Sequence, residues 1–250
     1  MNNYKTMPTE SFKDFCELCA QYLGGETQAN ENYISYKSPG SFWYNRNFIE
    51  SSDTDKIVES VNKIKSQIPK GFPFIVSYTK YDDSDITDKT LLKEGYPLFV
   101  NQTGMNFDLS KDFPVVNDEN IVMIGYDRIE DWSKTVSTAF GKPEDLNAFR
   151  AVSKSGEVRI YAYTENDEII GTAMTYTKNG NCGIHEVSVL GSHRGKGIAK
   201  KLILKTLLDA KNEGAKVASL QASALGEPLY ASIGFETVSI ISTYMSPPPH

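Results

Sequence analysis

The chain has 250 residues, of which 40% are hydrophobic and 23% charged, a balance that fits one large or two small globular domains. Its net charge of −6 argues against binding nucleic acid through a general basic surface. No apolar run is long enough to span a bilayer, and residues 1–5 lack the apolar core of a secretory signal. We therefore expect a cytoplasmic protein with neither a membrane nor a nucleic-acid partner.

The first half of the chain alternates helix and strand patterns. Residues 11–23 have a helical pattern, and a second, amphipathic helix follows the capping candidate Asp53. The other elements expected there are extended segments at 33–36 and 42–49, a strand at 74–78 and a short helix at 86–93. Residues 112–119 contain a proline and end in polar side chains, so we interpret them as a linker between domains at 1–111 and 120–250.

Three cysteines, Cys16, Cys19 and Cys182, form no disulfide framework, which fits a reducing compartment. Cys16 and Cys19 form a C-x-x-C pattern, but they share one face of a helical pattern with Phe12 and Phe15. The sequence has no second pair of cysteines or histidines to complete a four-ligand zinc site. We therefore interpret both cysteines as small core residues and predict no metal site.

The strongest functional signal is a strand, a glycine-rich turn and a helix in succession. Residues 183–190 are rich in β-branched side chains, residues 191–199 form the turn, and residues 198–212 have helical periodicity. Unpaired N–H groups at the helix start and glycines that let backbone approach phosphate oxygens make an anion site, to which Arg194 and Lys196 add charge. The patterns G-x-x-x-x-G-K-[ST] and G-x-G-x-x-G are absent, which excludes the phosphate loop of nucleotide triphosphatases and a dinucleotide fold.

A weak internal similarity connects the two halves. In each half a helix stops at a glycine, Gly95 or Gly234, and an aromatic residue opens the next strand. We interpret this pattern as a duplicated fold. The position that corresponds to Gly197 of the turn falls at Val58, inside a helix without glycine. The N-terminal half is therefore predicted to lack a phosphate-binding loop and to serve as a scaffold or a wall of the substrate site.

Two segments of the second half carry a family resemblance. Arg194-x-x-Gly197-x-Ala199 resembles the R/Q-x-x-G-x-G/A signature of the GNAT superfamily of N-acetyltransferases. Residues 227–235, with the sequence E-P-L-Y-A-S-I-G-F, resemble the family's L-Y-x-x-x-G-F segment. The strand before the first motif and the long helix after it provide the expected context for both.

The resemblance implies an α/β (α+β) fold with a mixed, mostly antiparallel sheet flanked by helices, here in a tandem of two such domains. In the catalytic half it implies strands at 120–126, 158–163, 169–177, 216–221 and 237–245, with a hairpin turn at Asn166-Asp167. It also implies helices at 129–140, 144–152 and 225–233.

The resemblance further implies acetyl-CoA as co-substrate and assigns its contacts. The pyrophosphate would lie on the backbone of Arg194, Gly195, Lys196, Gly197, Ile198 and Ala199, and the pantetheine arm on that of Val187, Ser188 and Val189. A backbone N–H near Val189 would stabilise the developing oxyanion.

Two side chains are candidates for proton transfer. Tyr230 matches the tyrosine that protonates the departing sulfur in family members; the alternative is an aromatic side chain packed against a strand. Glu186 is the candidate base for the amine; the alternatives are a solvated or ion-paired carboxylate, with water as the base. Strand alternation predicts that His185 lies on the opposite face from Glu186.

The leading hypothesis is an N-acetyltransferase (EC 2.3.1.-) that moves an acetyl group from acetyl-CoA to a primary amine, carried by a small molecule or a peptide. A non-catalytic acyl-CoA-binding regulatory module is the rival class. An acyltransferase that uses a larger acyl or an aminoacyl donor is the third hypothesis. The acceptor is expected between the two halves, near residues 42–44 or Trp132, and the sequence does not indicate the oligomeric state.

Overall fold

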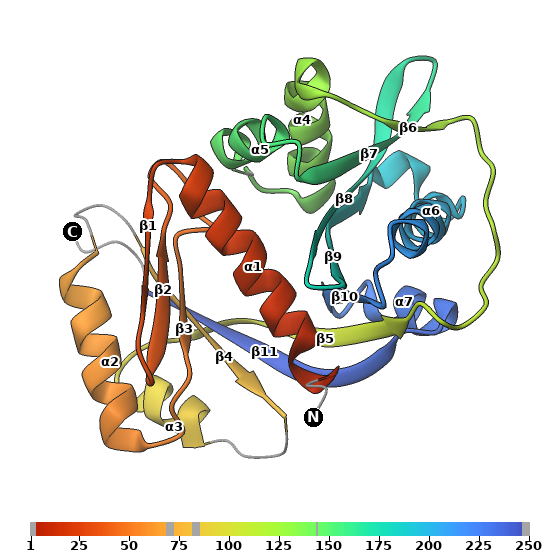
Figure 1. Cartoon of the computed structure of the whole chain (residues 1–250). Coiled ribbons are helices and arrows are strands. Elements are labelled where there is room, and N and C mark those ends of the chain that lie inside the picture. Colours follow the sequence, from red (N-terminus) through yellow and green to blue (C-terminus); the bar gives the residue numbers. More distant parts are fainter. Residues whose placement is uncertain (1–3, 69–72, 82–85, 144, 247–250) are drawn as a thin grey trace.

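The computed structural model describes residues 4–68, 73–81, 86–143 and 145–246. These residues form one sheet of 11 strands with helices against both of its faces (Figure 1). The α-helices are α1 (Met7–Tyr22), α2 (Thr54–Ser66), α3 (Ile86–Lys93), α4 (Ile129–Phe140), α5 (Leu146–Ser153), α6 (Ile198–Asn212) and α7 (Glu227–Ile233). Short 3-10 helices span Tyr4–Thr6, Tyr126–Arg128 and Gly191–His193.

The strands are β1 (Glu26–Ala29), β2 (Tyr33–Lys37), β3 (Arg46–Ile49), β4 (Phe74–Lys80), β5 (Leu98–Asp108), β6 (Ile121–Met123), β7 (Val158–Glu165), β8 (Glu168–Lys178), β9 (Asn181–Val189), β10 (Val217–Ala222) and β11 (Glu236–Ser246). None of the helices within the described ranges is long and apolar enough to span a membrane.

Local sequence signals account for most of the element ends. Asp53 caps α2, because its carboxylate accepts hydrogen bonds from the N–H groups of Asp55 and Lys56. Gly95 and Gly234 follow α3 and α7 with φ of 84° and 113°, a conformation that glycine adopts without steric cost. The predicted cap and both predicted helix stops are confirmed.

Three sequence expectations need correction. Strand β1 was not expected, since its E-T-Q-A sequence is mostly exposed and lacks apolar alternation. Within the segment expected to be extended at 42–49, only β3 is a strand. The helix expected at 144–152 begins at Leu146, and residue 144 lies outside the described residues.

The sheet runs through both halves of the chain in the order β1-β2-β3-β4-β11-β5-β10-β9-β8-β7-β6. Strand β11, from the C-terminal half, pairs antiparallel with both β4 and β5, and β5 pairs antiparallel with β10. The parallel pairs are β3 with β4 and β9 with β10. The predicted mixed, largely antiparallel sheet flanked by helices is confirmed. The central strands β5 and β11 are exchanged between the halves, as Figure 1 shows. The predicted duplication and its domain boundaries stay predictions.

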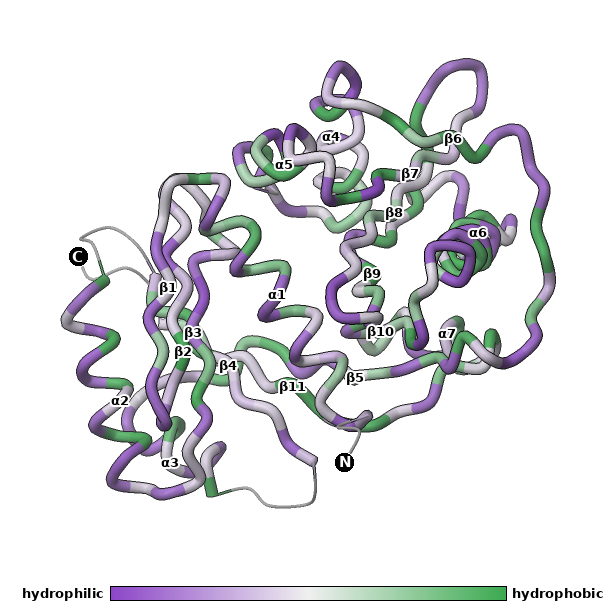
Figure 2. Tube along the Cα trace, in the orientation of Figure 1, coloured by the Kyte–Doolittle hydropathy of each residue, from purple (hydrophilic) through white to green (hydrophobic). Residues whose placement is uncertain are grey.

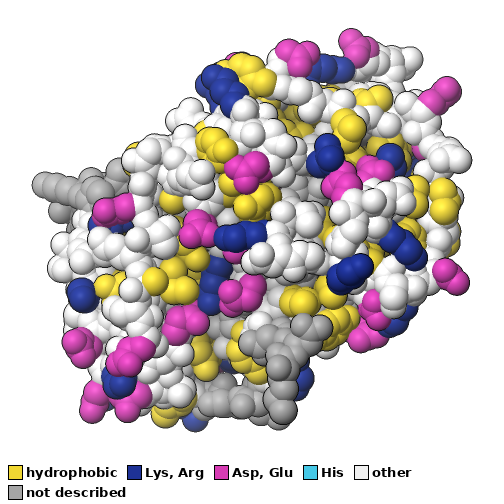
Figure 3. Space-filling view, in the orientation of Figure 1, with side chains coloured by type: hydrophobic (Ala, Val, Ile, Leu, Met, Phe, Trp, Pro, Cys, Tyr) yellow, Lys and Arg dark blue, Asp and Glu magenta, His cyan; other side chains and the backbone are white. Residues whose placement is uncertain are grey.

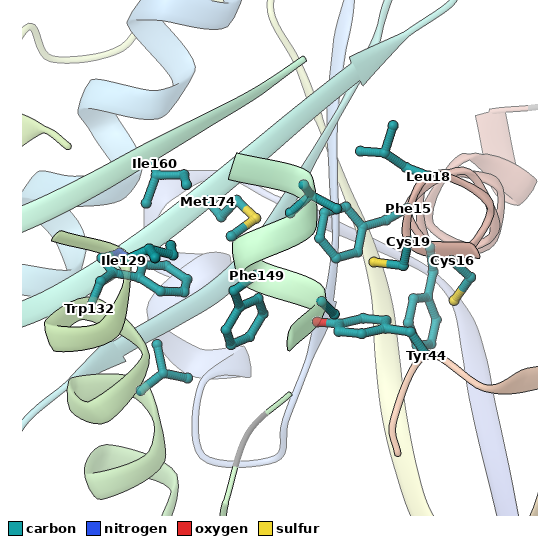
Figure 4. Packing of buried hydrophobic residues seen from close by; sticks show 14 of the residues in the cluster. Phe15, Cys16, Leu18, Cys19, Tyr44, Ile129, Trp132, Phe149, Ile160 and Met174 are labelled. Atoms are coloured by element: carbon teal, nitrogen blue, oxygen red, sulfur yellow. The ribbon is translucent and has the colours of Figure 1, made fainter. Parts of the chain in front are cut away.

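Helix α1 lies between the two halves and contributes to the largest core cluster. It contacts β9, β10 and α5 of the C-terminal half and β1 and β2 of the N-terminal half. Figure 4 shows Phe15, Cys16 and Cys19 of α1 beside Tyr44, with Phe149 across from them. Both cysteines are fully buried and unpaired, which confirms their prediction as core residues.

Hydropathy and charge follow this arrangement. Figure 2 shows hydrophobic and hydrophilic residues alternating along α1 and α6, as amphipathic helices against a sheet require. On the face seen in Figure 3, lysine and arginine side chains are interspersed with aspartate and glutamate. That face therefore carries no field of a single sign.

Candidate active site

The sheet opens between β9 and β10. The two strands pair in parallel at three positions only, the last of which joins Gly183 to Ser219. Beyond that point residues 184–189 of β9 pair only with β8 on their other side. The N–H group of Leu190 donates to Ile170 O, so strand alternation turns the N–H group of Val189 toward the open edge. The edge facing β10 therefore carries backbone groups that a ligand can pair with.

A β-bulge distorts β9 where this gap begins. Thr172 of β8 faces Ser188, but Met174 faces His185, so two residues of β9 stand opposite one residue of β8. Glu186 has φ of 53°, which is uncommon for a residue with a side chain. Its carbonyl accepts a 2.8 Å hydrogen bond from Thr172 Oγ1. Strained backbone of this kind is often retained at functional sites.

The bulge also overturns the prediction that His185 and Glu186 lie on opposite faces. The ring of His185 stacks on Phe15 of α1, with 4.5 Å between ring centroids. Glu186 accepts a hydrogen bond from Tyr44, whose ring also packs on Phe15. Both side chains line the same cavity, because the extra residue of the bulge resets the alternation.

The loop after β9 presents the start of α6 without a cap. Gly197 stands at the N-cap position with φ of 77°, and no side chain in the described chain caps the helix. The first amide with an intrahelical bond is that of Lys201, which donates to Gly197 O. A Cβ added to Gly195 or Gly197 would meet no described atom within 4 Å. Open space next to amides without an intrahelical partner suits an anion, and the residues present fit a diphosphate.

Helix α2 lies between the parallel strands β3 and β4, as α6 lies between β9 and β10, but a side chain caps its start. The Asp53 carboxylate already accepts the amides of Asp55 and Lys56, and a negative charge there repels an anion. The two helix starts therefore differ in chemistry as well as in glycine content. This contrast supports the prediction that the N-terminal half lacks a phosphate-binding loop.

The basic residues of the loop have different surroundings. The Arg194 guanidinium donates to the carbonyls of Val189 at 3.3 Å and Ala139 at 2.8 Å, so it ties the loop to the end of α4. Lys196 is exposed and does not line the adjoining cavity, whereas Lys200, in the first turn of α6, does. Lys200 is the basic residue on this cavity that the sequence did not single out.

Two cavities meet in the gap. The first, which we call the loop cavity, has a volume of about 770 Å³ and is lined by residues 187–189 and by the start of α6. The second, which we call the aromatic cavity, has a volume of about 280 Å³ and is lined by side chains of both halves, including Phe12, Trp43, Tyr44, Phe99 and Glu186. The residues that line both cavities are Phe140, Val187, Ser223 and Tyr230.

Tyr230 lies at the junction of the two cavities. It projects from α7, whose end at Gly234 positions it, and its ring packs edge-on against Phe235. Burial raises the pKa of its hydroxyl well above the ordinary value, so the group stays protonated at neutral pH. Among the described residues its hydroxyl has no hydrogen-bond partner, which leaves the proton available to a ligand.

Glu186 is held by a residue from the other half of the chain. Tyr44 Oη donates a 2.7 Å hydrogen bond to Glu186 Oε1. Burial, and then the Glu186 charge, raise the pKa of Tyr44 well above its ordinary value, so this hydroxyl remains a donor. This hydrogen bond holds the Glu186 carboxylate in the lining of the aromatic cavity.

Asp145, just before α5, fixes the segment that carries Tyr44. Its carboxylate accepts hydrogen bonds from Ser41 Oγ at 2.6 Å, the Phe42 N–H group at 2.8 Å and the Trp43 N–H group at 2.6 Å. Ser41 Oγ in turn accepts the Tyr44 N–H group at 3.0 Å. We call residues 41–44 the Trp43 loop. One carboxylate of the C-terminal half therefore holds it against the aromatic cavity.

The expected position of the acceptor is partly corrected. Trp43 and Tyr44 line the aromatic cavity, while Phe42 is 49% exposed and lines neither cavity. Trp132 is fully buried, and its indole N–H donates to Tyr161 O at 2.9 Å, so it is a core residue.

His185 is neutral in the folded protein. Burial lowers its pKa to about 3, because the charged ring would lose its hydration. No group of three or more histidine, cysteine, aspartate or glutamate side chains within the described ranges is arranged to hold a metal ion.

Comparison with known proteins agrees with this geometry. Residues 117–242, just over half of the chain, match the family model described as an acetyltransferase (GNAT) domain. No curated protein sequence matches the chain significantly. Among solved structures, a GCN5-related N-acetyltransferase from Kribbella flavida is similar with a TM-score of 0.68 and 12% identity over 96% of each chain. Another, from Sphaerobacter thermophilus, has a TM-score of 0.65 and 14% identity over 98% of this chain and 93% of that one. The TM-scores show a shared fold, and at such low identity they show the fold alone. The chain belongs to the GNAT acetyltransferase family.

Proposed function

We propose that this protein transfers an acetyl group from acetyl-CoA to a primary amine by direct attack of the amine on the thioester. The observation that carries the proposal is the meeting of the loop cavity and the aromatic cavity at Tyr230. When bound, acetyl-CoA supplies an activated carbonyl carbon. The chain's own residues hold it, orient the amine and move the protons.

The loop cavity is proposed to hold the cofactor. The backbone amides from Arg194 to Ala199 would bind the diphosphate, with Lys200 adding charge at the first turn of α6. The open edge of β9 at residues 187–189 would pair with the pantetheine arm. The N–H group of Val189, turned toward that edge, would stabilise negative charge as it develops on the carbonyl oxygen.

The aromatic cavity is proposed to hold the amine. Glu186 would accept the proton that the amine nitrogen loses as its bond to the carbonyl carbon forms, directly or through a water molecule. Tyr230 Oη would give its proton to the sulfur as the carbon–sulfur bond breaks. Tyr230 as proton donor and Glu186 as proton acceptor both line the aromatic cavity, which suits this exchange.

The N-terminal half takes part as a wall of the acceptor site. It contributes Phe12, Trp43, Tyr44 and Phe99 to the aromatic cavity, and its own helix start at α2 is closed to phosphate. We propose that it is a degenerate copy of the catalytic domain, at 1–111, joined by 112–119 to the domain at 120–250. A reducing, cytoplasmic setting is part of the proposal, and the buried, unpaired state of the three cysteines supports it.

The test is the release of free thiol from acetyl-CoA in the presence of a panel of primary amines. We expect release that depends on the amine and yields one N-acetyl product per thiol. Cofactor binding without turnover on any amine would instead favour a non-catalytic acyl-CoA-binding module. Longer acyl-CoA donors in the same assay measure whether the enzyme is selective for acetyl.

A further inference from the structure

Buried polar atoms without a hydrogen-bond partner are concentrated at the aromatic cavity. In the described part of the chain, such side-chain atoms are Nε and Nη1 of Arg46, Oε1 of Gln102, Nε2 of His185, and the hydroxyls of Thr87 and Ser239. Gln102 and His185 line the aromatic cavity. Arg46 lies directly behind its wall, as its ring contacts show. Buried polar groups are normally paired, so this concentration marks a place where a polar ligand belongs.

Arg46 is the most unusual of these residues. It is fully buried, and its guanidinium carbon lies 4.1 Å from the ring centre of Trp43 and 4.9 Å from that of Phe12, both of which line the aromatic cavity. Its single hydrogen bond within the described residues goes from Nη2 to Thr243 Oγ1 at 3.2 Å. No described carboxylate forms an ion pair with it. The positive charge is therefore buried without a counter-charge from the described residues.

Packing alone does not account for this arrangement. The two aromatic rings attract the guanidinium, but ring faces offer no acceptor in the plane of Nε and Nη1. Burial lowers the pKa of Arg46 to about 10, and it remains charged at neutral pH. An unpaired buried charge is costly, and a cavity beside it gains a positive potential that low-dielectric surroundings screen little. An anion in the aromatic cavity would provide the missing counter-charge.

Side chains of both charge signs line the same cavity. Lys142 lines it, and its ammonium lies 4.6 Å from the ring centre of Trp43, so two cations flank that ring. Glu186 also lines this cavity, where Tyr44 holds its carboxylate and where the amine is proposed to react. The volume of about 280 Å³ is at the small end of ligand sites.

We infer that the acceptor is a small amine that carries a carboxylate, of the size of a single free amino acid. Its amine lies at Glu186, and its carboxylate lies beside Trp43, in the field of Arg46 and Lys142. This inference rests on the proposed function and narrows its substrate class.

The experiment compares leucine with 3-methylbutylamine, which has the same side chain without the carboxylate. We expect kcat/KM for leucine to exceed that for the amine at least about tenfold, mainly through KM, because a charged interaction is lost. Leucinamide, which keeps the shape without the charge, should behave like the amine. Equal use of leucine and 3-methylbutylamine by the wild-type enzyme overturns the inference.

Variants of Arg46 test the residue itself. Arg46→Met removes the charge without leaving a buried counter-charge, so it should fold, and it should reduce the preference for leucine to about twofold or less. Arg46→Lys keeps the charge and should retain most of the preference. The matched control is Arg159→Met, which removes an exposed arginine paired with Glu213 and should leave the preference unchanged. A full preference in Arg46→Met overturns the inference.

A binding arm separates this inference from the proposed function. Calorimetry measures the binding of leucine and of 3-methylbutylamine to the wild type and to Arg46→Met, without acetyl-CoA. If no amine releases thiol but leucine binds to the wild type and not to Arg46→Met, the proposed function fails and the carboxylate site stands. If thiol is released with amines but leucine binds no better than 3-methylbutylamine, the carboxylate site fails and the proposed function stands.

Discussion

Asp145 is expected to hold the Trp43 loop in the wall of the proposed acceptor site without contacting the proposed cofactor site. Its carboxylate accepts three donors of the Trp43 loop, at 2.6, 2.8 and 2.6 Å. Oδ2 accepts both Ser41 Oγ and the Trp43 N–H group, while Oδ1 accepts only the N–H group of exposed Phe42. The variants Asp145→Ala and Asp145→Asn should therefore differ in a way that the geometry sets.

The magnitudes follow from which donors are left unpaired. A hydrogen bond to a charged acceptor contributes about 1.5–3 kcal/mol, and water can replace the one to Phe42. Asp145→Ala leaves the Ser41 and Trp43 donors without their acceptor, so it should lower the free energy of unfolding by about 3 kcal/mol. Asp145→Asn can keep its oxygen toward the Ser41 and Trp43 donors and turn its NH₂ group toward Phe42. It should therefore lower the free energy of unfolding by only about 1 kcal/mol.

Urea unfolding measures the stability, and steady-state kinetics measure the function. Because the Trp43 loop lines only the aromatic cavity, Asp145→Ala should raise the KM for the amine about tenfold and leave the dissociation constant of coenzyme A within about twofold. The control is Asp53→Ala, which removes a capping carboxylate at the exposed start of α2 and should cost about 1 kcal/mol with no change in KM. Equal weakening of coenzyme A and amine in Asp145→Ala would refute the reasoning.

Three other predictions test the site. Tyr230→Phe should lower kcat about 100-fold while calorimetry finds coenzyme A affinity unchanged; an unchanged kcat removes Tyr230 as the acid. Gly197→Trp covers the α6 amides and should weaken coenzyme A binding at least about 100-fold. Gly214→Trp, at φ of 87° and also in open space, should bear similar strain but bind normally. Burial lowers the pKa of His185 to about 3 in the folded chain. Below the ordinary pKa of histidine, the unfolded chain therefore binds a proton at this residue that the folded chain does not bind. The free energy of unfolding should therefore fall by about 1.4 kcal/mol per pH unit from about pH 6.5 toward 3. Urea titrations at several pH values should find that His185→Phe lacks this contribution to the pH dependence. A variant with the wild-type pH dependence would contradict the lowered pKa.

The parts of the fold that sequence predicted well are those with local causes. The bounds of α6 matched because Gly197 precedes a helical run that continues to Asn212. The hairpin between β7 and β8 follows from Asn166 and Asp167, which both adopt positive φ in a two-residue turn. The position of Tyr230 on α7 was predicted correctly, because its spacing from Gly234 is set within one helix end, and its role as the acid stays a prediction. Each of these signals lies within a few residues of the feature it predicts.

The parts that sequence missed depend on residues far apart in the chain. Tyr44 and Glu186 are separated by 142 positions, and Asp145 lies 102 positions from Trp43. No local pattern connects such pairs, because the sheet and α1 bring them together. The sequence did not predict a role for Arg46 for a related reason. An arginine in a strand pattern is expected to be exposed. Only the packing of Phe12 and Trp43 around its guanidinium shows that the charge is buried.

The exchanged strands explain how one half of the chain can carry the proposed cofactor loop while the other half shapes the proposed acceptor cavity. Strand β11 of the C-terminal half pairs with β4, and β5 of the N-terminal half pairs with β10. Neither half therefore forms its part of the sheet without a strand from the other. Helix α1 reinforces the connection, since Phe15 touches both His185 and Tyr44. The position of the Trp43 loop relative to α6 is therefore set by a continuous sheet and a shared helix. Under the proposed function, substitutions in the N-terminal half can change which amine fits while the start of α6, the proposed phosphate site, keeps its geometry.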